Sequence, residues 1–230
     1  MKYKIKGITM AVLVSSGIGS SITTSEAALI TYSFTGSSGN EASLAPDSQT
    51  AHLTASNITR GSGLNTASGA GTFAASGWTL GNSPDANDYF SFTLTPESGY
   101  VLSLTQLILD ERRSLTGIRE WSVRSSLDGF SSDLATFAVP DNDATRTGQT
   151  ISLSAALFGQ LDTPIEFRIY GYSSEQSGGT WRIDNLMVDG SVTASTTAAT
   201  VPDSLPFAFT GGILATTLFG GGCLRKRLAS

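Results

Sequence analysis

The feature that most constrains the fold of this sequence is a period-two alternation of apolar and polar residues in its middle part. In residues 88–95 (DYFSFTLT), apolar side chains fall on one face and hydroxyl side chains on the other. Residues 165–172 (IEFRIYGY) repeat the pattern and leave Arg168 and Tyr170 on the polar face. Strands of this kind bury one face and expose the other, as in antiparallel sheets. Because no long helical pattern separates them, the sequence predicts an all-β fold, an antiparallel β-sandwich.

In the strand that begins at residue 100, the apolar phase slips by one residue. Leu102 and Leu104 share one phase, whereas Leu107 and Leu109 share the other. A β-bulge inserts one unpaired residue and would bring all four onto one face. The sequence therefore predicts a bulge near Thr105–Gln106.

The rest of the domain has weaker patterns. A tight turn is expected at Asp128-Gly129, and one short helix at 153–161. Residues 36–86 are expected to form long loops, with short strands near 51–58 and 72–80.

The first 27 residues have the pattern of a secretory signal peptide. Three lysines precede an apolar stretch at 8–18 that is short for a membrane span, and small residues follow it. We expect a signal peptidase to cut between Ala27 and Ala28, which exports the domain 28–191; a buried N-terminal helix is the alternative. Cys223 is the only cysteine, so this domain has to be stable without an internal disulfide.

The C-terminal end combines an apolar run with a basic cluster. Residues 205–224 are uncharged and mainly apolar, about the length that a helix needs to cross a bilayer. The cluster that follows consists of Arg225, Lys226 and Arg227. Such clusters stay on the cytoplasmic side, so we expect one transmembrane helix with the domain outside; a soluble core helix is the alternative. Residues 192–200, rich in Ser, Thr and Ala, predict a flexible linker.

A short motif precedes the apolar run and consists of Val201, Pro202, Asp203 and Ser204. Together with the run and the basic cluster, it resembles a PEP-CTERM-type sorting signal in the variant that reads VPDSG. The sequence departs from that variant at Leu205, where the variant has glycine. The resemblance implies a bacterial protein that an exosortase-like protease cuts near 201–204, so that the membrane span is transient. A permanent anchor is the alternative that the departure leaves open.

The charges are distributed unevenly along the chain. Of the 14 Lys+Arg, three lysines lie at the N-terminus and three basic residues at the C-terminus, which leaves eight arginines and no lysine between them. The same stretch holds 18 of the 19 Asp+Glu. A surface with this acidic balance repels phosphate backbones, so no nucleic acid is expected among the partners.

The sequence lacks the motifs of common active sites. His52 is the only histidine and no Gly-x-Ser-x-Gly motif occurs, so a Ser-His-Asp triad is not expected. A zinc site made of His and Cys is excluded by their count. Asp110 and Glu111 are the nearest candidates for paired catalytic carboxylates, but neighbours in a strand point to opposite faces. We therefore expect no enzymatic activity, no catalytic residue and no required cofactor.

Arg112 and Arg113 are two of the few cations in this acidic domain, directly after a predicted strand. The interpretation we favour is a set of solvated ion pairs with neighbouring acids. The acids within reach are Asp110, Glu111 and Glu120. In the alternative, a guanidinium beside an aromatic ring binds a sugar carboxylate or hydroxyls. Trp181 is the candidate ring, although its phase in the strand points inward.

Residues 98–130 and 167–190 are similar to a β-sandwich that is often found ahead of such sorting signals, a family with no activity to transfer. The segment Ile183-Asp184-Asn185 is similar to the closing strand of jelly-roll carbohydrate-binding modules. That resemblance implies a jelly-roll sandwich in which Asp184 binds a structural calcium ion together with carbonyls near residues 35–39. A purely structural Asp184-Asn185 pair is the alternative.

These inferences predict an exported, non-enzymatic protein of the cell surface or extracellular matrix. The alternative is a carbohydrate-binding module that recognises envelope or matrix polysaccharide. The expected partners are signal peptidase, the exosortase-like protease, the membrane and, in the alternative, polysaccharide.

Overall fold

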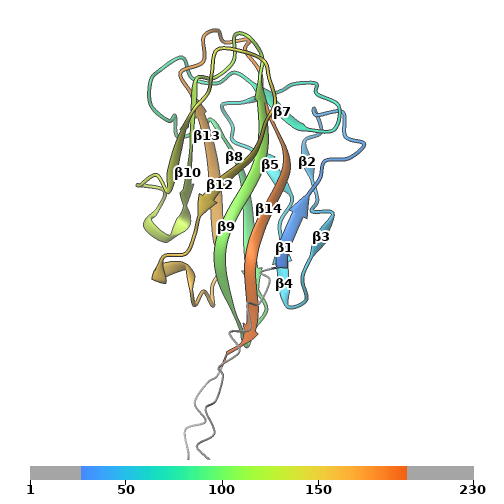
Figure 1. The fold of residues 1–230 in the computed structure, drawn as a ribbon, viewed down its shortest axis with the longest axis vertical. Coiled ribbons are helices and arrows are strands. Elements are labelled where there is room, and N and C mark those ends of the chain that lie inside the picture. The colour runs from blue at the N-terminus through green and yellow to red at the C-terminus, as the bar shows by residue number, and fades with distance from the viewer. Residues whose placement is uncertain (1–26, 196–230) are drawn as a thin grey trace, which may run out of the picture. The chain divides into compact units, whose positions relative to one another are not determined.

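The structure, a computed structural model, describes residues 27–195 (Figure 1). The predicted signal peptide up to residue 26, the sorting motif, the apolar run and the basic cluster lie outside the described residues. Among residues 27–195, no helix is long and apolar enough to span a membrane.

Within residues 27–195, two seven-stranded sheets face each other, and every strand pairing is antiparallel. The first sheet has the order β12-β9-β14-β1-β3, with β7 also on β14 and β6 on β7. Its strands are β1 (Ala27–Tyr32), β3 (Ser48–Gln49), β6 (Asn65–Thr66), β7 (Phe73–Ser76), β9 (Tyr100–Arg113), β12 (Arg146–Ser152) and β14 (Trp181–Ala194).

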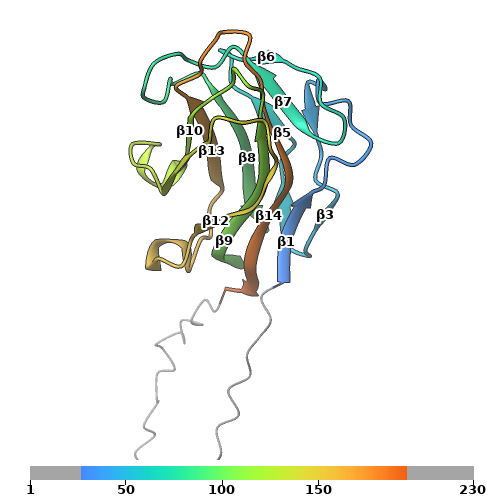
Figure 2. The same cartoon turned by 45° about the horizontal axis from the view of Figure 1, so that its top comes forward.

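The second sheet has the order β11-β10-β13-β8-β5-β2, with β4 also on β8. Its strands are β2 (Ser43–Leu44), β4 (Leu53–Ala55), β5 (Ile58–Arg60), β8 (Tyr89–Pro96), β10 (Glu120–Ser125), β11 (Ala135–Ala138) and β13 (Ile165–Tyr172). Figures 1 and 2 show the two layers, with the long strands β9 and β14 side by side in one and β10, β13 and β8 in the other. The prediction of an all-β antiparallel sandwich is confirmed.

The predicted bulge in β9 is present. Gln106 pairs with Asp189 and Leu104 pairs with Gly190, so Thr105 is the extra residue. Because of it, Leu107 and Leu109 are buried on the same face as Leu104. Gly190 is needed at this point, since a Cβ there would collide with the carbonyl oxygen of Ser103.

Two segment boundaries differ from the expectations. The predicted helix at 153–161 is only a single 3-10 turn at Ala156–Phe158, since the chain there returns directly to an isolated pairing of Leu161 with Leu102. Strand β14 continues to Ala194 and so includes the first three residues of the predicted linker, which pair with the start of β9.

The core between the sheets is aromatic. Trp78, Trp121 and Trp181 are all buried. The ring centroid of Trp181 lies 5.3 Å from that of Trp78 and 5.8 Å from that of Trp121. Since the chain has a single cysteine and no internal disulfide, burial of this apolar surface is the main source of stability.

Candidate ligand-binding surface

The two arginines singled out in the sequence lie on opposite faces of β9. Arg113 is in phase with Leu109 and points inward, with 0% of its side chain exposed. Its Nε donates to the carbonyl of Ser114 at 2.8 Å and its Nη2 to that of Leu115 at 2.7 Å. Its Nη2 also lies 3.0 Å from a carboxylate oxygen of Glu175. Arg113 therefore fixes the loop after β9 and presents no surface to a ligand, which corrects its assignment as a ligand-binding residue.

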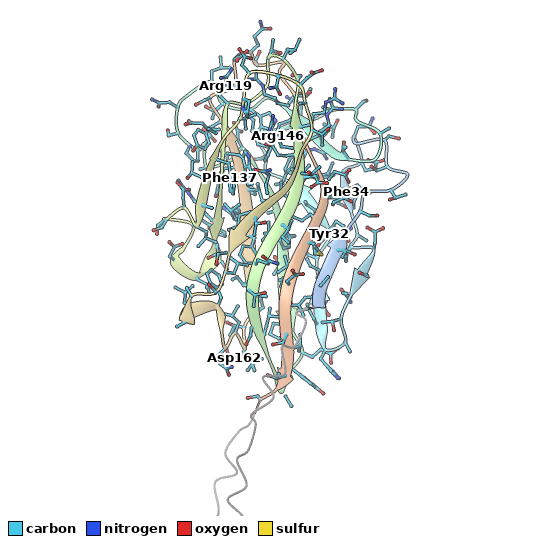
Figure 3. All side chains as sticks on the ribbon, viewed as in Figure 1. Tyr32, Phe34, Arg119, Phe137, Arg146 and Asp162 are labelled. Carbon is cyan, nitrogen blue, oxygen red and sulfur yellow. The ribbon has the colours of Figure 1, made fainter. Side chains whose placement is uncertain are left out.

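Glu111 is buried beside it, at the centre of a charged network. Arg146 of β12, which is labelled in Figure 3, donates to both carboxylate oxygens of Glu111, at 2.5 and 2.9 Å. The indole nitrogen of Trp181 donates to the same carboxylate at 2.6 Å. Trp181 has no exposed surface, so we assign its ring to the core and not to a ligand site. Asp110 lies on the opposite, outer face of β9, as expected for strand neighbours.

Arg112 is on the outer face, with 41% of its side chain exposed. It donates to the backbone carbonyl of Asp143 at 2.5 Å and to its carboxylate at 3.2 Å. The interpretation as a solvated ion pair is therefore right for Arg112, but the partner comes from the loop before β12 and not from a near neighbour in the sequence.

Asp184 lies on the outer face of β14, opposite Asp110. The carbonyls of Ser37, Ser38 and Gly39, which were expected to share a calcium ion with it, accept the backbone N–H groups of Gly71, Gly69 and Ala74, respectively. Within the part of the chain that the structure describes, no group of three or more His, Cys, Asp or Glu side chains is placed to hold a metal ion. Calcium binding at Asp184 stays a prediction.

The outer face of the second sheet carries a group of residues that we call the arginine–aromatic cluster. Its members are Tyr89 of β8, Arg124 of β10, Arg168 and Tyr170 of β13, and Phe130 of the loop after β10. The guanidinium carbon of Arg168 lies 3.8 Å from the ring centroid of Phe130 and 4.4 Å from that of Tyr89. The Arg124 guanidinium lies 5.2 Å from the ring of Tyr170. These are cation–π distances.

Strand register brings the cluster together. Tyr170 pairs with Tyr89, and Arg168 pairs with Arg124, so four side chains from three strands share one face. The neighbouring residues Phe167 and Ile169 fill the core from the other face of β13.

Phe130 reaches the cluster through an unusual turn. Gly129 and Phe130 have φ angles of 68° and 63°, so two successive residues adopt the left-handed conformation. This confirms the predicted turn, although its central residues are Gly129 and Phe130 instead of Asp128 and Gly129. For a bulky residue such a conformation is strained, and it persists only where the surroundings hold it. Here the Nη1 of Arg124 donates to the carbonyl of Phe130 at 3.2 Å, and the Asp128 carboxylate accepts two backbone N–H groups that follow.

Both arginines of the cluster form ion pairs with carboxylates. The Nε of Arg168 donates to Glu166 at 2.7 Å, and that of Arg124 donates to Asp133 at 2.6 Å. Burial disfavours the charged form of Arg168, but hydrogen bonds to Glu166 and Tyr170 outweigh it and raise the pKa of Arg168. Burial raises the pKa of Tyr170, so its phenol stays neutral.

An open pocket of about 220 Å³ adjoins the cluster. It is lined by Pro84, Asp85, Ala86, Arg124, Gly129, Phe130, Arg168 and Tyr170. It thus combines aromatic surface, fixed N–H donors and a carboxylate acceptor, the elements of a site for a polar ring-shaped ligand. The sequence indicates Arg168 and Tyr170 as outward residues of a strand, but their meeting with Phe130 follows from turn geometry.

No protein-family model matches this chain, and no curated protein matches it. Among solved structures, a family 29 carbohydrate-binding module is similar over 65% of this chain and 87% of its own, with 14% identity and a TM-score of 0.34. A family 61 module in complex with β-1,4-galactotriose covers 63% of this chain and 90% of its own, with 11% identity and a TM-score of 0.26. The enzymatically active domain of a tailspike protein of bacteriophage CBA120 is similar over 61% of this chain and 20% of its own, with 15% identity and a TM-score of 0.32. The function has to be argued from the geometry of this chain.

Proposed function

We propose that this protein is a non-enzymatic polysaccharide-binding protein whose site is the arginine–aromatic cluster. The observation that carries the proposal is the Arg168 guanidinium, held within 4.4 Å of two aromatic ring centroids beside an open pocket. A sugar ring has apolar C–H faces and a rim of hydroxyls. The ring of Phe130, which is only partly buried and lines the pocket, offers apolar contact, and the guanidinium groups offer donors whose geometry is already fixed.

A binding role without catalysis is supported by the contacts of the carboxylates beside the cluster and of the one histidine. Glu166 and Asp133, the carboxylates beside the cluster, are each bound to an arginine. His52 hydrogen-bonds to Glu97 at 2.9 Å and stacks on Tyr100 at 3.8 Å. These acids and the histidine are thus engaged in contacts that hold the fold, and none is paired with a nucleophile.

The proposal includes export and display at the cell surface or in the extracellular matrix. Ala27 pairs with Gly190, and Ala194 pairs with Tyr100, so the first and last described strands meet at one end of a jelly-roll-like domain. A signal peptide cut beside Ala27 and a C-terminal sorting signal read by an exosortase-like protease would both join the domain at that end. The outer faces of the sheets would stay free for polysaccharide.

A glycan array of envelope and matrix polysaccharides, probed with the full chain in detergent, tests the proposal. We expect binding to at least one polysaccharide and a loss of about tenfold or more in Arg168→Gln, because a charged hydrogen-bond donor is removed. Arg119→Gln is the control, since Arg119 is also a partly exposed arginine in ion pairs but lies outside the pocket. Silence across the array, or equal binding by Arg168→Gln, would favour a purely structural sandwich.

A further inference from the structure

A second polar pocket lies on the outer face of the other sheet. It measures about 200 Å³ and is lined by Ala70, Thr72, Arg112, Thr145, Arg182 and Asp184. Its floor is formed by β9 and β14, and its walls by the loops that precede β7 and β12. It is separate from the arginine–aromatic cluster, which belongs to the opposite sheet.

Two like charges face each other on the floor of this pocket. Arg112 and Arg182 are directly paired across β9 and β14. Residues in such positions are close neighbours, and like charges there destabilise a sheet. Arg112 is compensated by Asp143, whereas Arg182 takes part in none of the ion pairs formed by residues 27–195.

Arg182 also has an unsatisfied hydrogen-bond donor. Its Nε is buried without a hydrogen-bond partner among the described residues. Burial is the main cause that lowers the pKa of Arg182, and the positive charge of Arg112 lowers it further. A buried donor without a partner costs free energy, and a charged one costs more. An acceptor that enters the pocket would remove this cost.

Hydrogen bonds hold one wall of the pocket, the loop of Gly69, in place beside Arg182. Gly69 lies beside Arg182, where an added Cβ would be in ordinary van der Waals contact with the Arg182 Nη1, at 3.4 Å. The loop of Gly69 is tied to the loop before it by hydrogen bonds from Gly69 and Gly71 to the carbonyls of Ser38 and Ser37, at 2.8 and 2.9 Å. The wall of the pocket beside Arg182 is therefore in place before any ligand arrives, which lowers the entropic cost of binding.

The remaining polar groups narrow the class of ligand. Asp184 offers only acceptors, and burial, together with the charge of Asp110, raises its pKa. Its carboxylate accepts the N–H of Asn185 at 2.8 Å, and among the ion pairs of residues 27–195 none joins it to Arg182. Thr72 and Thr145 have hydroxyls that can donate or accept. The pocket thus needs a ligand with a carboxylate for the arginines and a hydroxyl donor for Asp184.

We propose that Arg112 and Arg182 form a binding site for the carboxylate of an acidic sugar, with Asp184 accepting one of its hydroxyls. Two guanidinium groups match a planar carboxylate in shape and charge. This site goes beyond the proposed polysaccharide site, and either one can fail without the other, because they are changed by different variants on opposite sheets.

Calorimetric titration of the full chain in detergent with sodium glucuronate, its methyl ester and glucose 6-sulfate tests the site. We expect glucuronate to bind, and the neutral ester to bind at least about tenfold more weakly, because it lacks the charge. Arg182→Gln should weaken glucuronate binding by a similar factor, whereas the control Arg119→Gln should not. Tighter binding of the sulfate ester than of glucuronate would overturn the assignment to a carboxylate.

Thermal unfolding without ligand separates this role from a structural one. If Arg182 serves the ligand, Arg182→Gln should unfold no earlier than the unchanged protein, since it removes an unpartnered charge. Equal binding of glucuronate and its ester, no binding of either, or glucuronate binding that survives Arg182→Gln would each overturn the proposal.

Discussion

At the scale of single residues, several side chains of this protein occupy positions that cost free energy. Phe130 adopts a left-handed conformation that suits glycine, and Glu111 and Arg113 are charged residues placed in the core. Each is held by named partners, such as the two hydrogen bonds from Arg146 to Glu111. Such positions are kept only where the surrounding structure compensates them.

The turn that carries Phe130 should depend on pH through Asp128. Burial opposes the charged form of Asp128, but hydrogen bonds from Ser131 and Ser132 prevail and lower its pKa. A lowered pKa means stabilisation that is complete above the unfolded value of about 3.9 and is lost as the pH falls through the folded value. Urea unfolding at a series of pH values should show a constant deficit for Asp128→Asn above about pH 5 that shrinks in more acidic solution. A deficit that grew on acidification would contradict this account.

At the scale of elements, the pairing of β9 with β14 positions both the core network around Glu111 and the pocket that holds Arg112 and Arg182. Two irregularities set its register, one at Thr105 and one after Asp184, where Asn185 adopts a φ of 47°. Beyond the second irregularity the outer face presents Asp110 opposite Asp184 and Arg112 opposite Arg182. A shift of this register by one residue would exchange the inner and outer faces of a strand.

Gly190 is the residue on which the first of these irregularities depends. In Gly190→Ala, the new Cβ would collide with the Ser103 carbonyl, so we expect a loss of about 2 kcal/mol or more in the free energy of unfolding. Gly178→Ala is the matched control, because a Cβ there meets no atom within 4 Å and should change stability by less than about 0.5 kcal/mol. Denaturation in urea measures both. Equal stability of the two variants would show that the bulge tolerates a side chain.

The sequence predicts structural features that depend on neighbouring residues, but not those that depend on contacts between distant segments. The bulge at Thr105 is visible in the local phase of the leucines around it, so it could be predicted. The burial of Glu111 and Arg113 could not, because it depends on Arg146 and Glu175 arriving from distant segments. Likewise, the pairing of Arg112 with Arg182 could not be predicted, because it depends on the register between β9 and β14.

At the scale of the whole molecule, the end of the domain where the first and last described strands meet lies far from the pocket of Arg112 and Arg182. Arg112 lies twelve residues along β9 from Tyr100, which pairs with the last residue of β14, Ala194. At strand geometry this is roughly 40 Å. If the domain is attached at this end, as we propose, the pocket of Arg112 and Arg182 would lie far from the point of attachment, and the arginine–aromatic cluster would lie on the other sheet.

The most direct test of the central claim is a comparison of Phe130→Gly with the unchanged protein. Glycine accepts the left-handed conformation without strain, so this variant should be at least as stable, yet it removes the ring from the cluster. We predict an unchanged or higher melting temperature and binding about tenfold weaker to the polysaccharide found on the array. Leu127→Ser, an exposed apolar position in the same loop outside the pocket, should keep full affinity. Undiminished binding by a stable Phe130→Gly would contradict the proposal that polysaccharide binds at this cluster.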